Sequence, residues 1–438
     1  MLPNKSARIA IAGSGTWGLS TALHLVNAGY TNITVFDRAS EIPSRYSAGF
    51  DINKIVRPEY EDPFYTELAL DAIKGWKTPL FGPYYHQTGY VVATSDRAPE
   101  KAVRHLHEAL SSIKEHPTFK PFISPLSSSN DFRELFWQFT GQVTGFKGYF
   151  NQFAGYAHSS SAMKGIYTHL TRRGVKFVLG DAGKITQLLY DDKGKRKCTG
   201  VKTSDGLDHA ADLVISCLGA YQASLIPDVG TFSVAKSWSV AHVQLTEEEC
   251  DLLRGIPVLN VRDLGFFFEP DPTTKLFKLC PLGAGYVNKR EDGISLPPLD
   301  KLPPPQDYIP VEDERKLRRL LQETLPWMAD RPFVDQKMCW FADTADSEYC
   351  VDFVPDTDNS LIVLSGDSGH GFKMMPIVGS WVIKLLSDGH QSLKRWQWRA
   401  PKQGSAEDWG DEVSWRIGKT KEIREVIEER SRMLKARL

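Results

Sequence analysis

Three glycines near the N-terminus have a spacing that lets a peptide backbone approach a phosphate group. They lie in the GxGxxG segment GSGTWG, whose residues are Gly13, Ser14, Gly15, Thr16, Trp17 and Gly18. Glycines at these positions permit a tight turn, and the helix that follows offers unpaired N–H groups and a partial positive charge to a pyrophosphate. Asp37, with Arg38 beside it, comes at about the distance at which an acid binds a ribose hydroxyl. The pattern therefore predicts a dinucleotide-binding site.

The elements that hold this turn are predicted to be a strand, a helix and a second strand. Residues 9–12 are apolar, apolar side chains recur at helical spacing over 19–26, and residues 33–36 form another apolar run. This βαβ order is typical of the start of a nucleotide-binding sheet. A glycine turn of purely structural purpose is the alternative, but strand, helix and acid stand in the required order. Asp37 argues against NADP and leaves FAD and NAD open.

Further strands compatible with the same sheet are predicted far along the chain. A helix and a strand are expected over 162–180, and buried strands at 211–218 and 361–364. The predicted fold is α/β, with a Rossmann-like nucleotide-binding domain and a second, mixed α+β substrate domain. The predicted ranges are 1–60, 150–230 and 335–400 for the nucleotide-binding domain, 61–149 and 231–334 for the substrate domain, and 401–438 for a C-terminal tail.

Composition argues against several classes of function. The chain has 438 residues and a net charge of −1, which gives no electrostatic signature for nucleic-acid binding. Its six cysteines are scattered without a CxxC pair, so neither a metal site nor a disulfide framework is expected. No apolar run reaches the length that crosses a bilayer, and we expect no secretory leader. The last residues, Ala436, Arg437 and Leu438, resemble a peroxisomal address. A chance match in a basic tail, with a cytoplasmic protein, is the alternative.

Five segments carry a more specific signal than the glycine turn. They read GSGTWGLSTALHL, SAGFDINKIVR, CLGAY, MCWFADTAD and GDSGHGFK. Through them the chain resembles the flavin amine oxidases of the monomeric sarcosine oxidase family, and within it the fungal saccharopine, pipecolate and fructosyl amino acid oxidases. The resemblance implies FAD as cofactor and an architecture like that of glutathione reductase and D-amino acid oxidase. It also implies oxidation of a carbon–nitrogen bond by O₂, giving an imine and hydrogen peroxide.

The resemblance assigns residues to the substrate carboxylate and to the flavin. In SAGFDINKIVR, Ser47 is implied to bind the cofactor and Lys54 to lie beside the flavin. Arg57 is implied to grip the substrate carboxylate, which suits its planar, bidentate fork. In GDSGHGFK, Lys373 is implied as a second carboxylate ligand that pairs with Arg57. The other cofactor-binding residues implied in this motif are Gly369, His370, Gly371 and Phe372.

These assignments have structural alternatives. Arg57 could instead form a surface ion pair with Glu59 or Glu61, and His370 could be an ordinary buried histidine. For Lys373 the local pattern favours function, because a lysine just inside the start of a helix opposes the helix dipole.

Cys339, in MCWFADTAD, corresponds to the cysteine that sarcosine oxidases join covalently to the flavin. The fructosyl branch has a second cysteine in this segment, where this chain has Phe341. We align Cys339 with the linking residue, so the resemblance implies a covalent FAD through Cys339. A non-covalent flavin and a buried, inert cysteine are the alternatives.

By the same resemblance, Lys278 is the lysine above the flavin that promotes the reaction with oxygen. A fixed cation suits this role because it stabilises the negative charge that oxygen acquires. Lys275 is the competing choice, and a lysine that merely extends from a strand edge toward water is the structural alternative.

The segment after Lys278 bears on the substrate. Fructosyl amino acid oxidases carry an acid pair there that helps to hold the sugar, whereas this chain reads Cys280-Pro281-Leu282. Those enzymes also often lack the arginine found here at Arg57. We therefore expect a secondary amino acid as substrate, with saccharopine first and pipecolate, sarcosine or another N-methyl amino acid after it. A fructosyl amino acid oxidase is the alternative.

Saccharopine bears three carboxylates, and Arg45 or Arg262 are candidates for extra contacts to them. A flavin dehydrogenase that passes electrons to a partner, and a non-enzymatic FAD-binding protein, are less favoured classes. The sequence indicates no oligomeric state.

Overall fold

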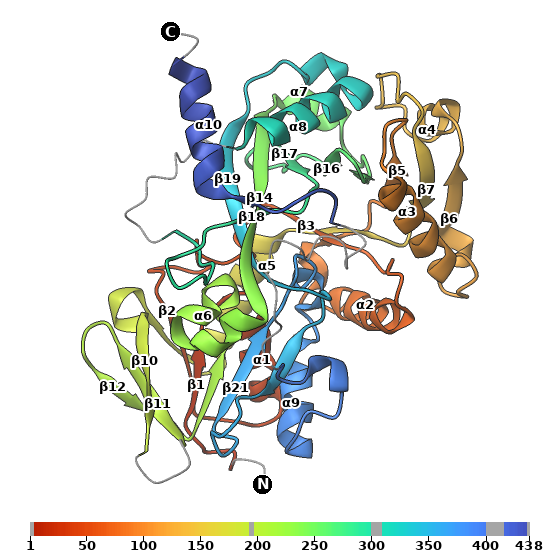
Figure 1. Ribbon diagram of the computed structural model, residues 1–438. Coiled ribbons are helices and arrows are strands. Elements are labelled where there is room, and N and C mark those ends of the chain that lie inside the picture. Colours follow the sequence, from red (N-terminus) through yellow and green to blue (C-terminus); the bar gives the residue numbers. More distant parts are fainter. Residues whose placement is uncertain (1–3, 192–196, 299–308, 400–415, 436–438) are drawn as a thin grey trace.

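The structure is a computed structural model that describes residues 4–191, 197–298, 309–399 and 416–435. Within these ranges two large β-sheets dominate, the smaller one at the bottom of Figure 1 and the larger one at the top. The long strand β14 (Ser233–Gln244) runs from the level of the smaller sheet up into the larger one, where β19 (Val334–Thr344) lies beside it.

The smaller sheet has the strand order β20-β21-β13-β1-β2-β9. Neighbours from β21 to β9 are parallel, and β20 pairs antiparallel at the edge. Its strands come from separated parts of the chain, as expected for a parallel sheet that needs long crossovers. The strands are β1 (Ile9–Ala12), β2 (Ile33–Asp37), β9 (Lys176–Leu179), β13 (Leu213–Ser216), β20 (Cys350–Phe353) and β21 (Leu361–Ser365). The helices of this half are α1 (Thr16–Asn27), α5 (Ser159–Arg172), α6 (Gln222–Leu225) and α9 (Val378–Asp388).

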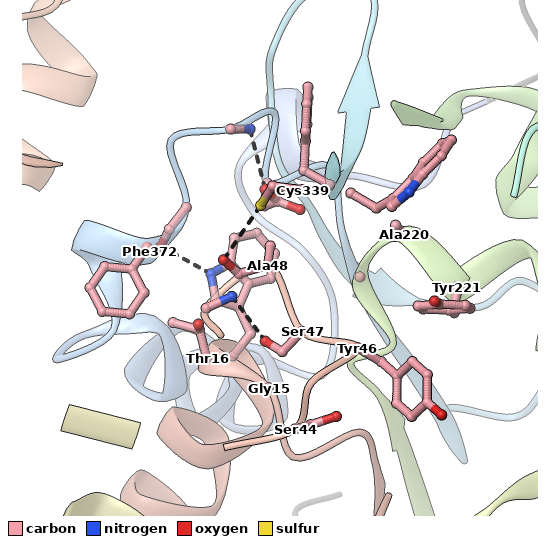
Figure 2. A pocket seen from close by; sticks show the side chains of 18 of the residues that line it. Gly15, Thr16, Ser44, Tyr46, Ser47, Ala48, Ala220, Tyr221, Cys339 and Phe372 are labelled. Atoms are coloured by element: carbon pink, nitrogen blue, oxygen red, sulfur yellow. Dashed lines mark hydrogen bonds between the residues drawn. The ribbon is translucent and has the colours of Figure 1, made fainter. Parts of the chain in front are cut away.

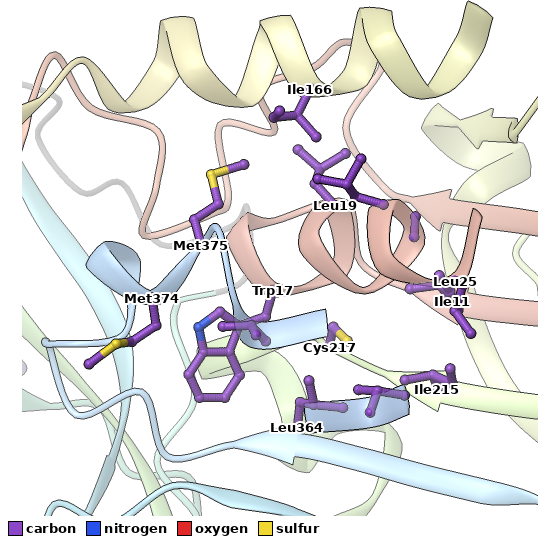
Figure 3. Packing of buried hydrophobic residues seen from close by; sticks show 14 of the residues in the cluster. Ile11, Trp17, Leu19, Leu25, Ile166, Ile215, Cys217, Leu364, Met374 and Met375 are labelled. Atoms are coloured by element: carbon purple, nitrogen blue, oxygen red, sulfur yellow. The ribbon is translucent and has the colours of Figure 1, made fainter. Parts of the chain in front are cut away.

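Helix α1 begins directly after the glycine turn, where strand and helix approach closely. Gly13 has a φ of +97°, a conformation that favours glycine. A Cβ on Gly18 would lie 1.9 Å from the carbonyl oxygen of Gly13, so only glycine fits there. Figure 3 shows α1 packed between α5 and the strands, and each large apolar side chain buried there stabilises the fold by about 1.5–3 kcal/mol. The cluster includes Ile11, Trp17, Leu19, Leu25, Ile166, Ile215 and Leu364.

The larger sheet has the strand order β22-β18-β14-β17-β16-β15-β5-β7-β6, and β19 pairs with β14 off this path. Its other strands are β5 (Tyr90–Thr94), β6 (Ile123–Leu126), β7 (Lys147–Asn151), β15 (Val258–Val261), β16 (Gly265–Phe267), β17 (Leu276–Pro281), β18 (Tyr286–Val287) and β22 (Lys421–Glu422). The helices of this half are α3 (Glu100–Ile113), α4 (Ser129–Leu135), α7 (Glu247–Leu252), α8 (Val311–Thr324) and α10 (Ile423–Lys435), whereas α2 (Pro63–Trp76) packs mainly into the core around the smaller sheet. The two small sheets are formed by β3 (Lys54–Val56), β4 (Tyr85–His86) and β8 (Gly155–Ala157), and by β10 (Ile185–Tyr190), β11 (Cys198–Thr203) and β12 (Asp208–Ala210).

The position of β19 differs from the predicted domain ranges. Most of this strand falls in 335–400, the range assigned to the nucleotide-binding domain, yet it pairs antiparallel with β14 in the larger sheet. Trp238 of β14 stands opposite Cys339 of β19. The sequence pattern could not assign the sheet, because alternation along one strand does not specify its neighbour.

Part of the range predicted as a C-terminal tail joins the larger sheet, because β22 pairs with β18. Before it, Arg416 is fully buried, contacts the Asp343 carboxylate of β19 and donates to the Thr344 carbonyl oxygen at 3.2 Å. Lys236 of β14 lies 3.2 Å from the same carboxylate. Burial and the nearby Arg416 lower the pKa of Lys236 to about 7. One carboxylate is therefore enclosed with two basic groups.

In the described ranges no helix has both the length and the apolar composition needed to cross a membrane. The same part of the chain contains no group of three or more His, Cys, Asp or Glu side chains placed to hold a metal ion. The six cysteines are free thiols.

Candidate active site

A cavity of about 470 Å³ lies where the two sheets meet, and most of the predicted site residues line it. Of the predicted residues, Ser14 and Gly18 do not line the cavity; Ser14 is hydrogen-bonded to Asp37, and Gly18 lies against the Gly13 carbonyl oxygen. The predicted residues that do line it are Gly13, Gly15, Thr16, Trp17, Asp37, Arg38, Ser47, Lys54, Arg57, Lys278, Cys339, Gly369, His370, Gly371, Phe372 and Lys373.

The glycine turn and Asp37 form one end of this cavity. Gly15 caps α1 without a side-chain hydrogen bond, so the first N–H groups of the helix remain available to an anion. The Asp37 carboxylate accepts from the Ser14 N–H at 2.8 Å and the Ser14 hydroxyl at 2.6 Å. It also accepts from the Ala39 N–H at 2.8 Å and the Ser44 hydroxyl at 3.0 Å. These donors fix the carboxylate, and the two hydroxyls can rotate to leave an oxygen for a sugar hydroxyl.

Two tyrosines that the sequence reasoning did not select lie beside this end. The Arg38 guanidinium lies 3.8 Å from the ring centre of Tyr46 and 5.2 Å from that of Tyr221. Both rings line the cavity, and Figure 2 shows them on the side away from Cys339. Tyr221 is the last residue of the CLGAY motif, and that motif is the sequence signal that could have identified it. The pair offers flat aromatic surfaces next to the nucleotide-binding turn.

Cys339 lies at the middle of the cavity, next to the loop before β3 (Figure 2). Its Sγ lies 3.7 Å from Lys54 Nζ and 3.8 Å from the Ala48 carbonyl oxygen, so the thiol is held but still faces the cavity. Phe341 follows on the same strand and lines the cavity too, with its ring 4.4 Å from that of Trp238. The replacement of a cysteine by Phe341 thus adds an apolar wall beside Cys339.

Lys278 and Lys54 share one buried carboxylate, that of Asp51. The Asp51 Oδ2 atom lies 2.6 Å from Lys278 Nζ and 2.9 Å from Lys54 Nζ. Lys278 also donates to the Asn53 carbonyl oxygen at 2.7 Å. Burial would raise the pKa of Asp51, but the two ammonium groups bring it well below its usual range. Burial lowers the pKa of Lys278, and Asp51 offsets part of that effect.

The sequence reasoning missed Asp51, although an acid between two functional segments of SAGFDINKIVR was a visible signal. Its presence changes the electrostatics, because two lysines and one carboxylate leave a single net positive charge. Lys275, the competing choice, pairs with Glu247 at 2.8 Å and does not line the cavity.

Arg57 and Lys373 both line the cavity, and both lie close to one aromatic ring, that of Tyr60. The Arg57 guanidinium lies 4.8 Å from the centre of the Tyr60 ring, and Lys373 Nζ lies 5.0 Å from it. Lys373 Nζ donates to the Tyr60 hydroxyl at 2.7 Å and to the His370 carbonyl oxygen at 3.0 Å. Burial and the Arg57 charge bring the pKa of Lys373 well below its usual value. Two residues more than three hundred positions apart are thus brought together.

The alternative ion pairs of Arg57 do not occur among the described residues. Glu59 is buried and accepts from the Asn151 side-chain amide at 2.6 Å. Glu61 contacts His105 instead. Arg57 therefore has its charge available to the cavity.

His370 contacts Tyr60, Tyr349 and Ser347 beside Lys373. Its Nε2 lies 3.0 Å from the Ser347 carbonyl oxygen, so Nε2 carries the proton and Nδ1 accepts. Nδ1 lies 2.9 Å from the Tyr60 hydroxyl and 2.8 Å from the Tyr349 hydroxyl. Burial and the Lys373 charge bring the pKa of His370 well below its usual value. The neutral imidazole thus positions the Tyr60 hydroxyl, which accepts a hydrogen bond from Lys373 Nζ.

The prediction that Lys373 lies just inside the start of a helix that opposes its charge is wrong. The residue lies in a short 3₁₀ turn, Phe372–Met374, and α9 begins only at Val378. Within the described residues Lys373 lies outside α9, so its position does not oppose the dipole of that helix. The protonated form of Lys373 is disfavoured instead by burial and by the nearby positive charge of Arg57.

Of the two extra arginines considered, the structure places one in the cavity. Arg45 is exposed and donates to the Tyr46 hydroxyl at 2.7 Å. Arg262 is buried and lines the cavity. The C-terminal residues Ala436, Arg437 and Leu438 lie outside the described residues.

The chain is similar to known FAD-dependent oxidoreductases along most of its length. The family profile described as FAD dependent oxidoreductase matches residues 8–385. The L-saccharopine oxidase of Schizosaccharomyces pombe is 34% identical over 433 residues, which cover 94% of this chain and 96% of that protein. The fructosamine oxidase Amadoriase II of Aspergillus fumigatus has a TM-score of 0.87 and 32% identity, covering 97% of each chain. A fructosyl peptide oxidase from E. terrenum has a TM-score of 0.87 and 31% identity, covering 97% of this chain and 98% of that one.

Proposed function

The chain belongs to the FAD-dependent oxidoreductase family, and on that premise we propose that it is an oxidase of the C–N bond in a secondary amino acid, with saccharopine ranked first. The predicted α/β fold and the recognised fungal branch are confirmed by the same comparisons. When bound, FAD supplies the two-electron acceptor for this oxidation.

The observation that carries the proposal is the pairing of Arg57 and Lys373 over the Tyr60 ring in the cavity that Cys339 also lines. Two basic groups buried side by side repel each other, and an incoming carboxylate relieves that repulsion. The carboxylate of an amino acid bound there would leave its amine and adjacent C–H bond directed toward the middle of the cavity. Fixing this geometry supplies most of the rate enhancement if the amine binds neutral, because no strong protein base is then needed.

The remaining residues fit the cofactor. The N–H groups at the start of α1 suit the pyrophosphate, and the Asp37 carboxylate suits a ribose hydroxyl. A Cβ on Gly15 would lie 3.1 Å from the Ser47 hydroxyl oxygen, so glycine keeps the cradle between them open. The thiol of Cys339 is the group that would form a covalent bond to the flavin.

We predict that replacing Cys339 by alanine abolishes covalent flavin attachment. Acid-precipitated wild-type protein should keep its yellow colour, whereas Cys339→Ala protein should lose it to the supernatant. Cys280→Ala is the matched control, because Cys280 also lines the cavity as a free thiol and should leave the colour on the protein. Colour that washes out of the wild type would refute the link.

A fructosyl amino acid oxidase is the second candidate, and the similarity to Amadoriase II favours it. Against it stands the cavity lining after Lys278, where Cys280 and Leu282 offer no carboxylate to a sugar. Sugar hydroxyls buried against such groups lose hydrogen bonds to water without replacement.

A peroxide assay with saccharopine, pipecolate, sarcosine and fructosyl-valine tests the proposal. We expect hydrogen peroxide with saccharopine, pipecolate and sarcosine, highest kcat/KM with saccharopine, and little with fructosyl-valine. The reverse order would establish the second candidate. Flavin bleaching without peroxide formation would indicate a dehydrogenase.

A further inference from the structure

Arg262 is a buried guanidinium whose side chain has no hydrogen-bond or ion-pair partner in the described part of the chain. It follows β15, is 4% exposed, and lines the same cavity as Arg57 and Lys373. Its Nε and Nη2 atoms are buried without a hydrogen-bond partner. A guanidinium taken out of water carries a large free-energy penalty unless an anion or several acceptors meet it.

Neighbouring polar groups are also left with spare hydrogen-bonding capacity. Asn260 lines the cavity, and its Nδ2 donates to the Tyr90 hydroxyl at 2.9 Å, while its Oδ1 has no partner. The buried hydroxyl of Tyr149 has no hydrogen-bond partner in the described ranges either. Several buried polar groups without hydrogen-bond partners in one region indicate that a polar ligand completes the site.

The charges around Arg262 do not balance. Burial lowers its pKa, and the positive charge of Arg57 acts in the same direction. Glu59 attracts both arginines but forms no ion pair with either one within the described residues. Even with Lys373 neutral, two arginines face a single carboxylate, and the excess charge is positive.

We propose that Arg262 binds a second carboxylate of the substrate, so that the enzyme selects secondary amino acids that carry two or more carboxylates. The inference rests on the proposed function, in which Arg57 and Lys373 hold the first carboxylate. Phe266 and Phe268 also line the cavity, and apolar walls suit the methylene groups that separate two carboxylates. Arg262 is thereby a specificity-determining residue.

The test compares Arg262→Met with the wild type on saccharopine and on two substrates with a single carboxylate, pipecolate and sarcosine. Loss of a buried charge pair with the substrate should lower kcat/KM for saccharopine by about 30-fold or more. The loss should lie mainly in KM, because the contact is equal in the ground and transition states. The values for pipecolate and sarcosine should change by less than about 3-fold.

Two further variants sharpen the result. Arg262→Lys keeps the charge and should recover part of the activity on saccharopine. Arg45→Met removes an exposed arginine outside the cavity and should leave the preference between substrates unchanged.

Equal losses on all three substrates would overturn the inference, since Arg262 would then serve the first carboxylate or the fold. No loss on any of them would overturn it as well. A binding measurement separates its failure from that of the proposed function. Flavin absorbance titrations of the holoenzyme should show tighter binding of glutarate than of acetate, and Arg262→Met should remove that difference even if none of the amino acids is oxidised. Equal binding of both anions by the wild type would sink the inference alone.

Discussion

Arg57→Met should lower kcat/KM for amino acid substrates by about 30- to 4,000-fold, the range expected when one partner of a buried, charge-assisted pair is removed. Arg57 has no ion-pair partner among the described residues, so its charge is free to meet a carboxylate. Anaerobic flavin reduction, followed as the loss of yellow colour at increasing substrate concentration, measures the effect.

The control is a substrate that lacks the carboxylate. An amine formed by decarboxylating the preferred amino acid should react slowly with the wild type and equally slowly with Arg57→Met. The kcat/KM of Arg57→Lys for amino acids should lie between those of the wild type and Arg57→Met, because an ammonium group keeps the charge but not the bidentate hydrogen bond. If Arg57→Met lost as much activity on the amine as on the amino acid, Arg57 would not be the carboxylate ligand.

Lys278→Met should slow the reaction with oxygen by about 100- to 1,000-fold, the usual cost of removing one group that stabilises developing charge. Flavin bleaching by substrate without oxygen should change little. The protein should still fold, because Asp51 keeps its ion pair with Lys54 at 2.9 Å. Stopped-flow mixing of bleached enzyme with oxygenated buffer gives the rate at which the yellow colour returns.

Lys275→Met is the matched control for this variant. Lys275 lies outside the cavity and pairs with Glu247, so both half-reactions should keep their wild-type rates. Unchanged reoxidation in Lys278→Met would show that the cation is not needed. A loss of bleaching instead would place Lys278 at the substrate.

The parts of the site that the sequence predicted are those in which chemistry and spacing are local. The glycine turn could be recognised because Gly13, Gly15 and Gly18 need only the strand and helix that flank them. Arg57 and Lys373 were paired through the family resemblance, since no local pattern joins residues so distant.

The features that the sequence did not predict depend on contacts between residues far apart in the chain. Asp51 becomes a partner of Lys278 only when the folded chain brings β17 next to the loop before β3. The buried state of Arg262 depends on how the turn after β15 faces the cavity. The sheet to which β19 belongs is decided by its pairing with β14. The pattern of residues within β19 does not specify that neighbour.

The burial of Arg416 has a practical consequence for anyone who shortens this chain. The strand that carries Cys339 also carries Asp343, and Arg416 reaches that carboxylate from the C-terminal segment. A version ending near residue 400 would leave Lys236 as the remaining basic group beside the buried Asp343 carboxylate, and it would also remove β22 from the larger sheet. A stop codon that removes an apparently dispensable end would therefore disturb the strand that presents the Cys339 thiol to the cavity.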